Sequence, residues 1–307
     1  MDSGSLTHGT PRPILTVRME KIPVSVLVPT KNEIANIRDC LRSVEFADEV
    51  VVVDSASTDG TVAAAESMGA RVVQFQWDGR YPRKKNWSLA NIPWRHEWIL
   101  IVDADERIPS GLAQEIREAI AEPRADGYYL NRRFWFLGGW IRHCGYFPSW
   151  NLRLFRHRLG HYEKVEMPAG DTSAGDNEVH EHVLLDGPSA YLGSPMDHYA
   201  FPSYAVWIEK HNRYSDWEAA VARGLHVERG GATMADSPTG SPLARKRWLK
   251  RVAGGLPGRP LLRFFYHYII KQGFRDGWRG WVLCRSLGWY EWVGQVKARE
   301  RTLPPAG

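Results

Sequence analysis

Three acidic residues follow directly on an apolar run. The letters DADE occupy residues 103–106, after WILIV at 98–102. Asp103 and Asp105 are two residues apart, so in an extended segment both carboxylates point the same way. Two neighbouring carboxylates repel each other and favour a nearby cation. Hard oxygen donors suit Mg²⁺ or Mn²⁺, which take further ligands from water and phosphate. The pair therefore predicts a divalent-metal site, with a solvated acidic strand end as the alternative.

Two more polar stretches follow apolar runs. PTKNE (29–33) comes after VSVLV, and DSASTDG (54–60) comes after EVVVV. Ligands of open α/β sheets collect at the carboxyl ends of strands. Thr30, Asn32 and Asp54 could hydrogen-bond a nucleotide there, or could be polar caps at three strand ends. Because three loops should converge on one edge, we favour a ligand site.

Two common nucleotide-binding loops are missing from these stretches. The loop after the first apolar run contains no glycine and so lacks GxGxxG, which argues against a classical NAD or FAD site. The chain also has no GxxxxGK[ST] motif, which argues against a P-loop ATPase.

Strands and helices are expected to alternate in the first half of the chain. Strands are predicted at 24–29, 49–54, 71–75 and 98–103, and helices at 33–44, 83–91 and 110–122. A further helix should start at Ser57 as its cap and end before Gly69. Strands that read as continuous apolar runs between helices imply a parallel sheet covered on both faces.

The pattern changes after residue 126. Residues 127–138 and 180–192 read as strands, with a hairpin turn expected at Asp186-Gly187. Residues 203–223 and 244–299 read as helices. We therefore predict a disordered tail at 1–22, a catalytic domain at 23–202, and a helical basic-aromatic region at 203–307 with a flexible loop at 224–243.

Composition narrows the class of protein. The chain has 307 residues, 43% hydrophobic, with a net charge of +5, so nucleic acid, nucleotide and anionic lipid are all compatible partners. Three scattered cysteines without a CxxC fit a reducing compartment. The N-terminus lacks the features of a signal peptide, and no run of about 20 uncharged apolar residues predicts a transmembrane helix.

Three stretches together resemble glycosyltransferase family 2. They are VSVLVPTKNEIANIRDCLRSV, EVVVVDSASTDGT and WILIVDADE, and the resemblance extends over residues 23 to about 200. It implies a GT-A fold with a mostly parallel central sheet, followed here by a helical basic extension. It also implies inverting transfer from a nucleotide-diphosphate sugar. Residues 198–219 and 264–284 resemble a narrower branch, the bacterial lipopolysaccharide-core glucosyl- and heptosyl-type transferases.

The resemblance implies roles for individual residues. Asp54 would accept a hydrogen bond from the base, with uracil expected, and Asp103 would lie near the ribose or the donor sugar. Asp105 would bind the metal on the diphosphate, whereas Glu106 is expected only to open the next turn. The other donor-site residues would be Pro29, Thr30, Asn32 and Glu33 around the nucleotide, and Lys84, Lys85 and Asn86 at the diphosphate or sugar. For Arg83 to Lys85 a solvated basic turn is the alternative.

An inverting transfer needs a base for the acceptor hydroxyl, placed after DADE in the chain. We predict Glu181 in NEVHEHV (177–183), with Glu178 as the runner-up and a polar edge strand as the alternative. His180 and His198 are minor candidates for a further metal nitrogen. Two more basic residues lie at 150–157. Arg153 and Arg156 could hold an acceptor phosphate or pair with surface acids, and surface pairing is expected for Arg156.

The C-terminal region mixes cations with aromatics. Residues 245–279 contain ten Lys and Arg against one acid, Asp276. This mixture suits an anionic membrane surface, although RNA binding uses the same residue types, and the aromatics could be core. We predict a metal-dependent enzyme, at the cytoplasmic membrane face, that glycosylates a glycan or lipid-linked acceptor and has no nucleic-acid partner. A nucleotidyltransferase and a non-catalytic scaffold are the alternatives.

Overall fold

The computed structural model describes residues 20–78, 81–163, 165–166, 182–222, 228–229, 239 and 258–300. Glu178, His180 and Glu181 lie outside these residues, as do 1–19 and most of the loop predicted at 224–243. The cations at 245–251 also lie outside them. The predictions for these segments stay predictions.

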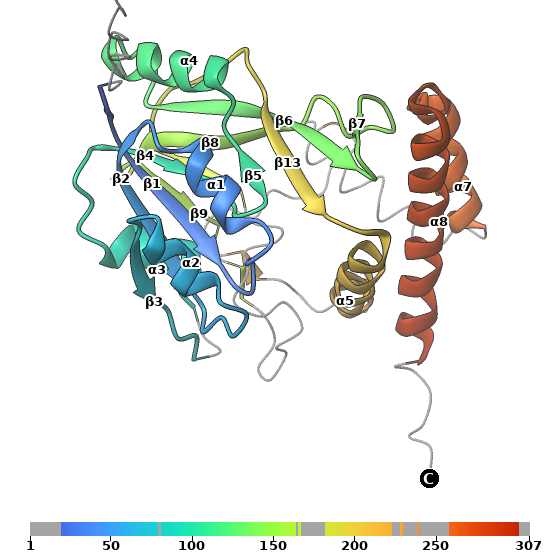
Figure 1. The fold of residues 1–307 in the computed structure, drawn as a ribbon. Coiled ribbons are helices and arrows are strands. Elements are labelled where there is room, and N and C mark those ends of the chain that lie inside the picture. Colours follow the sequence, from blue (N-terminus) through green and yellow to red (C-terminus); the bar gives the residue numbers. More distant parts are fainter. Residues whose placement is uncertain are drawn as a thin grey trace, which may run out of the picture.

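The first half of the chain forms the parallel part of a large sheet (Figure 1). Its order is β3-β2-β1-β4, and every pairing among these four strands is parallel. The four predicted strands are thus confirmed. Their bounds are Ile22–Thr30 for β1, Ala47–Asp54 for β2, Arg71–Gln74 for β3 and Trp98–Ile101 for β4.

Helices cover both faces of this parallel part. Val26 of β1 shares a core cluster with Ile37 of α1 and Leu112 of α4, whereas the next residue, Leu27, belongs to a second cluster that includes Ile92. Because neighbouring side chains point to opposite faces, a strand buried on both sides must be apolar throughout. The helices are α1 (Ile37–Ser43), α2 (Thr61–Ser67), α3 (Lys84–Asn91) and α4 (Ser110–Ala121).

The two ends of α2 differ in how well the sequence predicts them. Gly69, with φ +80°, follows the helix in the left-handed region, as expected for a C′ glycine. The predicted cap at Ser57 is wrong, because the helix starts at Thr61 after Gly60. The Ser57 hydroxyl donates instead to Asp54 at the end of β2.

The second half of the chain extends the sheet in mixed orientation. β8 lies antiparallel between β4 and β6, while β12 and β13 run parallel to β6. Two short strands, β5 and β7, pair with β13 and β6. The bounds are β5 (Glu106–Arg107), β6 (Gly127–Phe136), β7 (Gly139–Ile141), β8 (Trp150–Arg156), β12 (Ser189–Tyr191) and β13 (Met196–Phe201).

Two small sheets accompany the large one. β9 (Gly160–Tyr162) pairs with β11 (Val183–Leu185), and β10 (Val165–Glu166) pairs with β14 (Glu228–Arg229). The predicted hairpin at Asp186-Gly187 is therefore wrong. Its two flanking strands have different partners, because β11 joins β9 whereas β12 joins the large sheet.

Helices at the end of the chain pack beside the sheet (Figure 1). They are α5 (Tyr204–Ala222), α7 (Arg259–Phe265), a π turn (Tyr266–Ile270), a 3-10 turn (Gly273–Asp276) and α8 (Gly277–Glu300). Trp207 of α5 and Leu283 of α8 share a third core cluster with Phe136 of β6. None of the described helices is both long enough and apolar enough to span a membrane.

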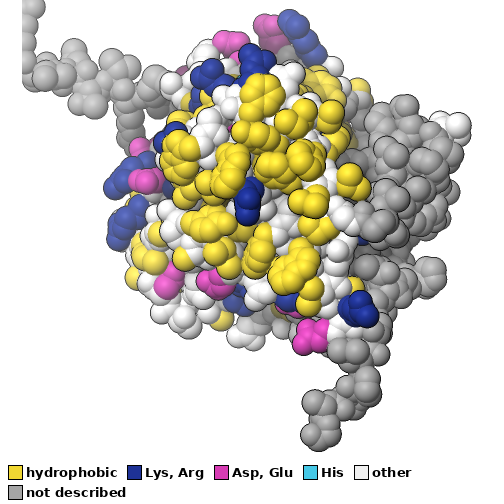
Figure 2. Space-filling view, turned by 90° about the vertical axis from the view of Figure 1, so that its right-hand side faces the viewer, with side chains coloured by type: hydrophobic (Ala, Val, Ile, Leu, Met, Phe, Trp, Pro, Cys, Tyr) yellow, Lys and Arg dark blue, Asp and Glu magenta, His cyan; other side chains and the backbone are white. Residues whose placement is uncertain are grey.

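Glycines bring α8 close to its neighbours. A Cβ on Gly280 would lie 1.9 Å from the Gly273 carbonyl oxygen, and one on Gly288 would lie 2.8 Å from that of Pro260. Both positions therefore require glycine for the observed packing. As a result α7, the two turns and α8 form one closely packed unit. Figure 2 looks onto the side of the molecule that this unit occupies in Figure 1.

His211 makes the third core cluster sensitive to pH. Its ring stacks on Trp207 at 3.7 Å, and burial lowers the pKa of His211 to about 4, with Arg263 and Lys210 adding to the effect. An unfolded chain would protonate this histidine near pH 6.5, so folding is penalised progressively as the pH falls from about 6.5 to about 4. Between pH 7 and pH 4.5, the free energy of unfolding should fall on the order of 2–3 kcal/mol less in His211→Phe than in wild type. Urea unfolding of both proteins at pH 7 and pH 4.5 measures this, and parallel losses in both would contradict it.

Candidate active site

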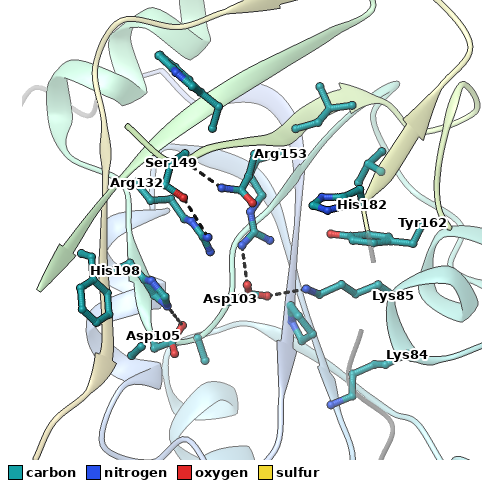
Figure 3. A pocket seen from close by; sticks show the side chains of 18 of the residues that line it. Lys84, Lys85, Asp103, Asp105, Arg132, Ser149, Arg153, Tyr162, His182 and His198 are labelled. Atoms are coloured by element: carbon teal, nitrogen blue, oxygen red, sulfur yellow. Dashed lines mark hydrogen bonds and ion pairs between the residues drawn. The ribbon is translucent and has the colours of Figure 1, made fainter. Parts of the chain in front are cut away.

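A cavity of about 810 Å³ opens at the carboxyl ends of β1 and β4 (Figure 3). Its lining comes from parts of the chain far apart in sequence: the end of β1, the start of α3, the turn after β4, strands β6, β8 and β13, and helix α5. The predicted residues that line it are Pro29, Thr30, Glu33, Lys84, Lys85, Asp103, Asp105 and His198. The three strand-end loops therefore converge on this edge as predicted: those after β1 and β4 line the cavity, and the one after β2 bonds the loop after β1, although Asp54 is not part of the lining.

The DADE segment forms a turn. The Glu106 amide donates to the Asp103 carbonyl at 2.8 Å, so the two aspartates do not lie in an extended strand as the sequence suggested. Both carboxylates nevertheless reach the cavity, where each meets its own basic partners (Figure 3). Side-chain cations therefore offset the repulsion expected between neighbouring carboxylates.

Asp103 is held by two cations. Arg153 lies 2.6 Å from one carboxylate oxygen and Lys85 lies 3.0 Å from the other. Burial alone raises the pKa of Asp103, but Arg153 and Lys85 outweigh it and hold the pKa well below its usual range. Asp103 is thus a fixed anion whose orientation depends on strand β8 and helix α3.

Glu106 has a larger part than the sequence suggested. Its side chain is completely buried and lies 2.7 Å from Arg153 and 3.6 Å from Arg132. It also accepts a hydrogen bond from the Asp103 amide at 2.9 Å. The expectation that Glu106 only opens the next turn is wrong, because this carboxylate fixes both Asp103 and Arg153 from behind the cavity.

The two arginines of β8 have different surroundings. Arg153 is 4% exposed, and its partners are the acids of the DADE turn rather than surface acids. Arg156 pairs with Glu97 and Asp126 at the surface, as predicted. The alternation of the strand explains this difference, since residues three apart point to opposite faces.

Asp105 faces the other side of the cavity. His198 Nε2 of β13 lies 3.6 Å from one carboxylate oxygen, and Lys210 Nζ of α5 lies 3.9 Å from the other. The Tyr199 amide donates to the Asp105 carbonyl at 2.7 Å, which ties the turn to β13. Burial raises the pKa of Asp105, while His198 and Lys210 lower it below its ordinary value.

Asp105 and His198 are suited to share a divalent cation. Ligands at about 2.1 Å from an octahedral ion stand about 3.0 Å apart when adjacent, so a gap of 3.6 Å needs only a small adjustment. A carboxylate oxygen and an imidazole nitrogen are both accepted by Mn²⁺. The described residues contain no group of three or more His, Cys, Asp or Glu side chains that could hold a metal ion. Among the described residues, further ligands would come from water or substrate, and the predicted His180 lies outside them.

The first two loops hold each other in place. Asp54 is completely buried and accepts hydrogen bonds from the Thr30 hydroxyl at 3.0 Å and the Ser57 amide at 2.8 Å. Asn32 has φ +55°. Its backbone N–H donates to the Ser57 hydroxyl, and its side-chain oxygen accepts from the Thr58 backbone N–H. Neither Asp54 nor Asn32 belongs to the cavity lining, and their contacts with a nucleotide stay predictions.

The basic segment before β4 is buried, so the alternative of a solvated turn is wrong. Lys84 is 2% exposed and donates to the Thr30 carbonyl at 2.7 Å, which connects α3 to the end of β1. Lys85 points into the cavity over the Tyr162 ring, 5.2 Å from its centroid. Asn86 exchanges hydrogen bonds with the Tyr162 backbone, outside the cavity lining.

Several lining residues carry no local sequence signal. Lys210 and His211 come from a helix about 100 positions after DADE, and Arg132 comes from the middle of β6. Glu163 is a further carboxylate on the wall near Tyr162. The one available signal is a helical pattern that places residues 207, 210, 211 and 214 on one face, which could have indicated that α5 lines the cavity. Among the described residues, six Lys and Arg line the cavity against four acids: Lys31, Lys84, Lys85, Arg132, Arg153 and Lys210, with Glu33, Asp103, Asp105 and Glu163.

Comparisons with known proteins identify relatives of this chain. The sequence model described as Glycosyl transferase family 2 matches residues 25–184. The lipopolysaccharide core biosynthesis glycosyltransferase LpsC of Rhizobium meliloti is 30% identical over 212 residues, which are 65% of this chain and 71% of that protein. An uncharacterized glycosyltransferase of Rickettsia bellii is 44% identical over 106 residues, 34% of this chain. The matched part spans only 35% of that Rickettsia protein.

The matches among solved structures include a mannosyltransferase from Pyrobaculum calidifontis in complex with GDP-Man and Mn²⁺. It is 18% identical, with a TM-score of 0.44, and the match covers 93% of this chain and 89% of that one. The match with the family and the parallel sheet followed by helices confirm the predicted GT-A type of α/β fold. The chain belongs to glycosyl transferase family 2.

Proposed function

We propose that this glycosyltransferase moves a sugar, with inversion, from a UDP-sugar to a hydroxyl group of a glycan or lipid-linked acceptor of the cell envelope. One observation carries the proposal. Asp103 and Asp105, at the end of β4, share a single cavity with the end of β1 and with a surplus of cations. This arrangement has room for a nucleotide sugar and charge of the right sign for its diphosphate.

The acceptor class rests on the relationship to LpsC, whose printed name refers to lipopolysaccharide core biosynthesis. The acceptor side of the cavity would be the part formed by β6, β8 and α5. Tyr146, Trp150 and Tyr214 line this part, and aromatic rings of this kind pack well against the apolar faces of sugars. Arg132 also lies there and would meet an anionic group of the acceptor.

The chemical step needs a base, a fixed donor and a neutralised leaving group. A carboxylate removes the acceptor proton while the acceptor oxygen attacks the anomeric carbon, and the bond from that carbon to the diphosphate breaks. We retain Glu181 as this base, with Glu178 as the runner-up. Lys85 and Arg153 hold Asp103 in a fixed orientation, where it can position the ribose or the donor sugar.

Asp105 and His198 would hold Mn²⁺ or Mg²⁺, and the ion, when bound, would offset charge on the departing nucleoside diphosphate. Lys210 lies beside Asp105 and adds positive charge on the same side of the cavity. These side chains converge on the cavity from the turn after β4, from β13 and from α5.

We expect the protein to release nucleoside diphosphate from one UDP-sugar when a membrane-derived acceptor and Mn²⁺ are supplied. A panel of UDP-, GDP- and ADP-sugars, with and without acceptor and with EDTA as control, measures this. Pyrophosphate release from a nucleoside triphosphate would instead identify the nucleotidyltransferase alternative. Binding of nucleotide without turnover of any donor would support the non-catalytic scaffold.

A further inference from the structure

The C-terminal unit exposes an unusual amount of apolar surface. Of the twenty exposed large hydrophobic residues among those described, twelve lie between 261 and 296. Figure 2 shows many hydrophobic side chains gathered on the described part of this side of the molecule, interspersed with a few Lys and Arg. Continuous apolar patches of this size on a folded protein mark a contact with another molecule or a membrane. The first half of this surface comes from α7 and the π turn: Leu261, Leu262, Phe265, Tyr266, Ile269 and Ile270.

The second half comes from one side of α8. Together with the exposed Arg285, its exposed apolar residues recur at spacings of three and four, which places them on a single helical face. The opposite side of the same helix is also apolar, with Leu283, Cys284 and Leu287 buried in the third core cluster. Apolar side chains therefore lie on two opposite sides of α8, and those on the outer side are exposed. The exposed apolar residues of α8 are Trp278, Trp281, Trp289, Trp292 and Val296.

Within residues 258–296 the exposed charge on this surface is positive. Residues 258–296 contain two acids, and both point inward: Asp276 bonds the His143 amide and Glu291 pairs with Arg259 and Arg263. The side chains of these acids are 4% and 10% exposed. Lys271, Arg275 and Arg285 are exposed instead. Two of them lie over aromatic rings, Arg285 over Trp281 and Lys271 over Tyr266.

We infer that the outer side of α7, the two turns and α8, here called the C-terminal face, docks on an anionic lipid bilayer. Tryptophan and tyrosine prefer the headgroup level of a membrane, and exposed cations add attraction to anionic lipids. The outer surface therefore has both of the properties that interfacial docking requires. Gly280 and Gly288 hold α8 against its neighbours, so the face is preformed.

The test is co-sedimentation of the full-length protein with vesicles. Wild type should bind vesicles of phosphatidylcholine and phosphatidylglycerol and bind pure phosphatidylcholine more weakly. Trp281→Ser with Trp292→Ser should lower the partition coefficient by about tenfold or more. Arg275→Gln with Arg285→Gln should lower it about fivefold per cation at low salt, and the loss should shrink as salt is added. Quenching of tryptophan fluorescence by brominated lipid reports insertion directly.

Ile208→Ser is the matched control, because this exposed residue lies on α5 outside the C-terminal face. It should bind vesicles like wild type, and circular dichroism should show that all variants are folded. No binding by wild type, or equal binding by the tryptophan variant, would overturn the inference. A dimer that dissociates in the tryptophan variant without any change in vesicle binding would also overturn it, and would assign the face to a second copy. Vesicle binding needs no donor, so failure of the transfer assay leaves this test unaffected.

Discussion

Asp105→Asn is expected to lower kcat/KM for sugar transfer about 10²–10³-fold, since a group that offsets charge on a leaving diphosphate contributes several kcal/mol to the transition state. The substitution keeps the size of the side chain and removes its charge. His198 and Lys210 would keep their places on β13 and α5, so the change acts on the charge facing the donor. Kinetics with a saturating acceptor measure the loss.

A second measurement separates metal binding from other effects of this change. Titration of Mn²⁺ in the presence of UDP, followed through the paramagnetic signal of the free ion, should show a weaker site in Asp105→Asn. Asp39→Asn is the control, because its carboxylate is exposed and pairs with Arg42 on α1. Unchanged Mn²⁺ affinity together with unchanged transfer in Asp105→Asn would reject the metal assignment.

Arg153→Met is expected to destabilise the fold by about 3–5 kcal/mol, because it leaves the charge of Glu106 buried without its closest partner. Glu106 has no exposed surface, and Arg153 is 2.7 Å from it. The same substitution frees Asp103, so transfer should fall in whatever protein remains folded. Urea unfolding followed by circular dichroism gives the free energy of unfolding.

Two further variants make this prediction specific. Arg156→Met, on the same strand, breaks surface ion pairs and a cation–π contact with Trp98, and should cost about 1–2 kcal/mol. Glu106→Gln combined with Arg153→Met removes both buried charges and should recover part of the loss. Equal destabilisation by Arg153→Met and Arg156→Met would show that the buried pair contributes no more to the free energy of unfolding than the surface pairs do.

The parallel half of the fold could be predicted because its signals are local. Strands β1 to β4 are continuous apolar runs, and Gly69 ends α2 through its own backbone conformation. The loops at the strand ends follow from this alternation. The resemblance then added chemical roles that spacing alone does not provide.

The rest of the site depends on contacts between distant segments. No residue near Glu106 in sequence predicts its pairing with Arg153, 47 positions later. Ser57 has the sequence context of a helix cap, but its hydroxyl donates to Asp54 instead. The pairing partners of β11 and β12 could not be predicted either, because both strands are three residues long and too short to show an alternating pattern. Lys210 reaches Asp105 only because α5 returns to the sheet edge.

Helix α5 contributes to the cavity and also packs against the C-terminal unit. Lys210 and His211 line the cavity, while Trp207 packs against α8 and Tyr204 hydrogen-bonds Ser286 at 2.7 Å. The distance from the C-terminal face to the cavity is therefore set by the thickness of two packed helices. For a protein lying on a bilayer through this face, the cavity mouth stands at a constant height above the headgroups. Such an enzyme would select acceptors by how far their hydroxyl group stands from the bilayer, and would glycosylate those that reach the height of the cavity.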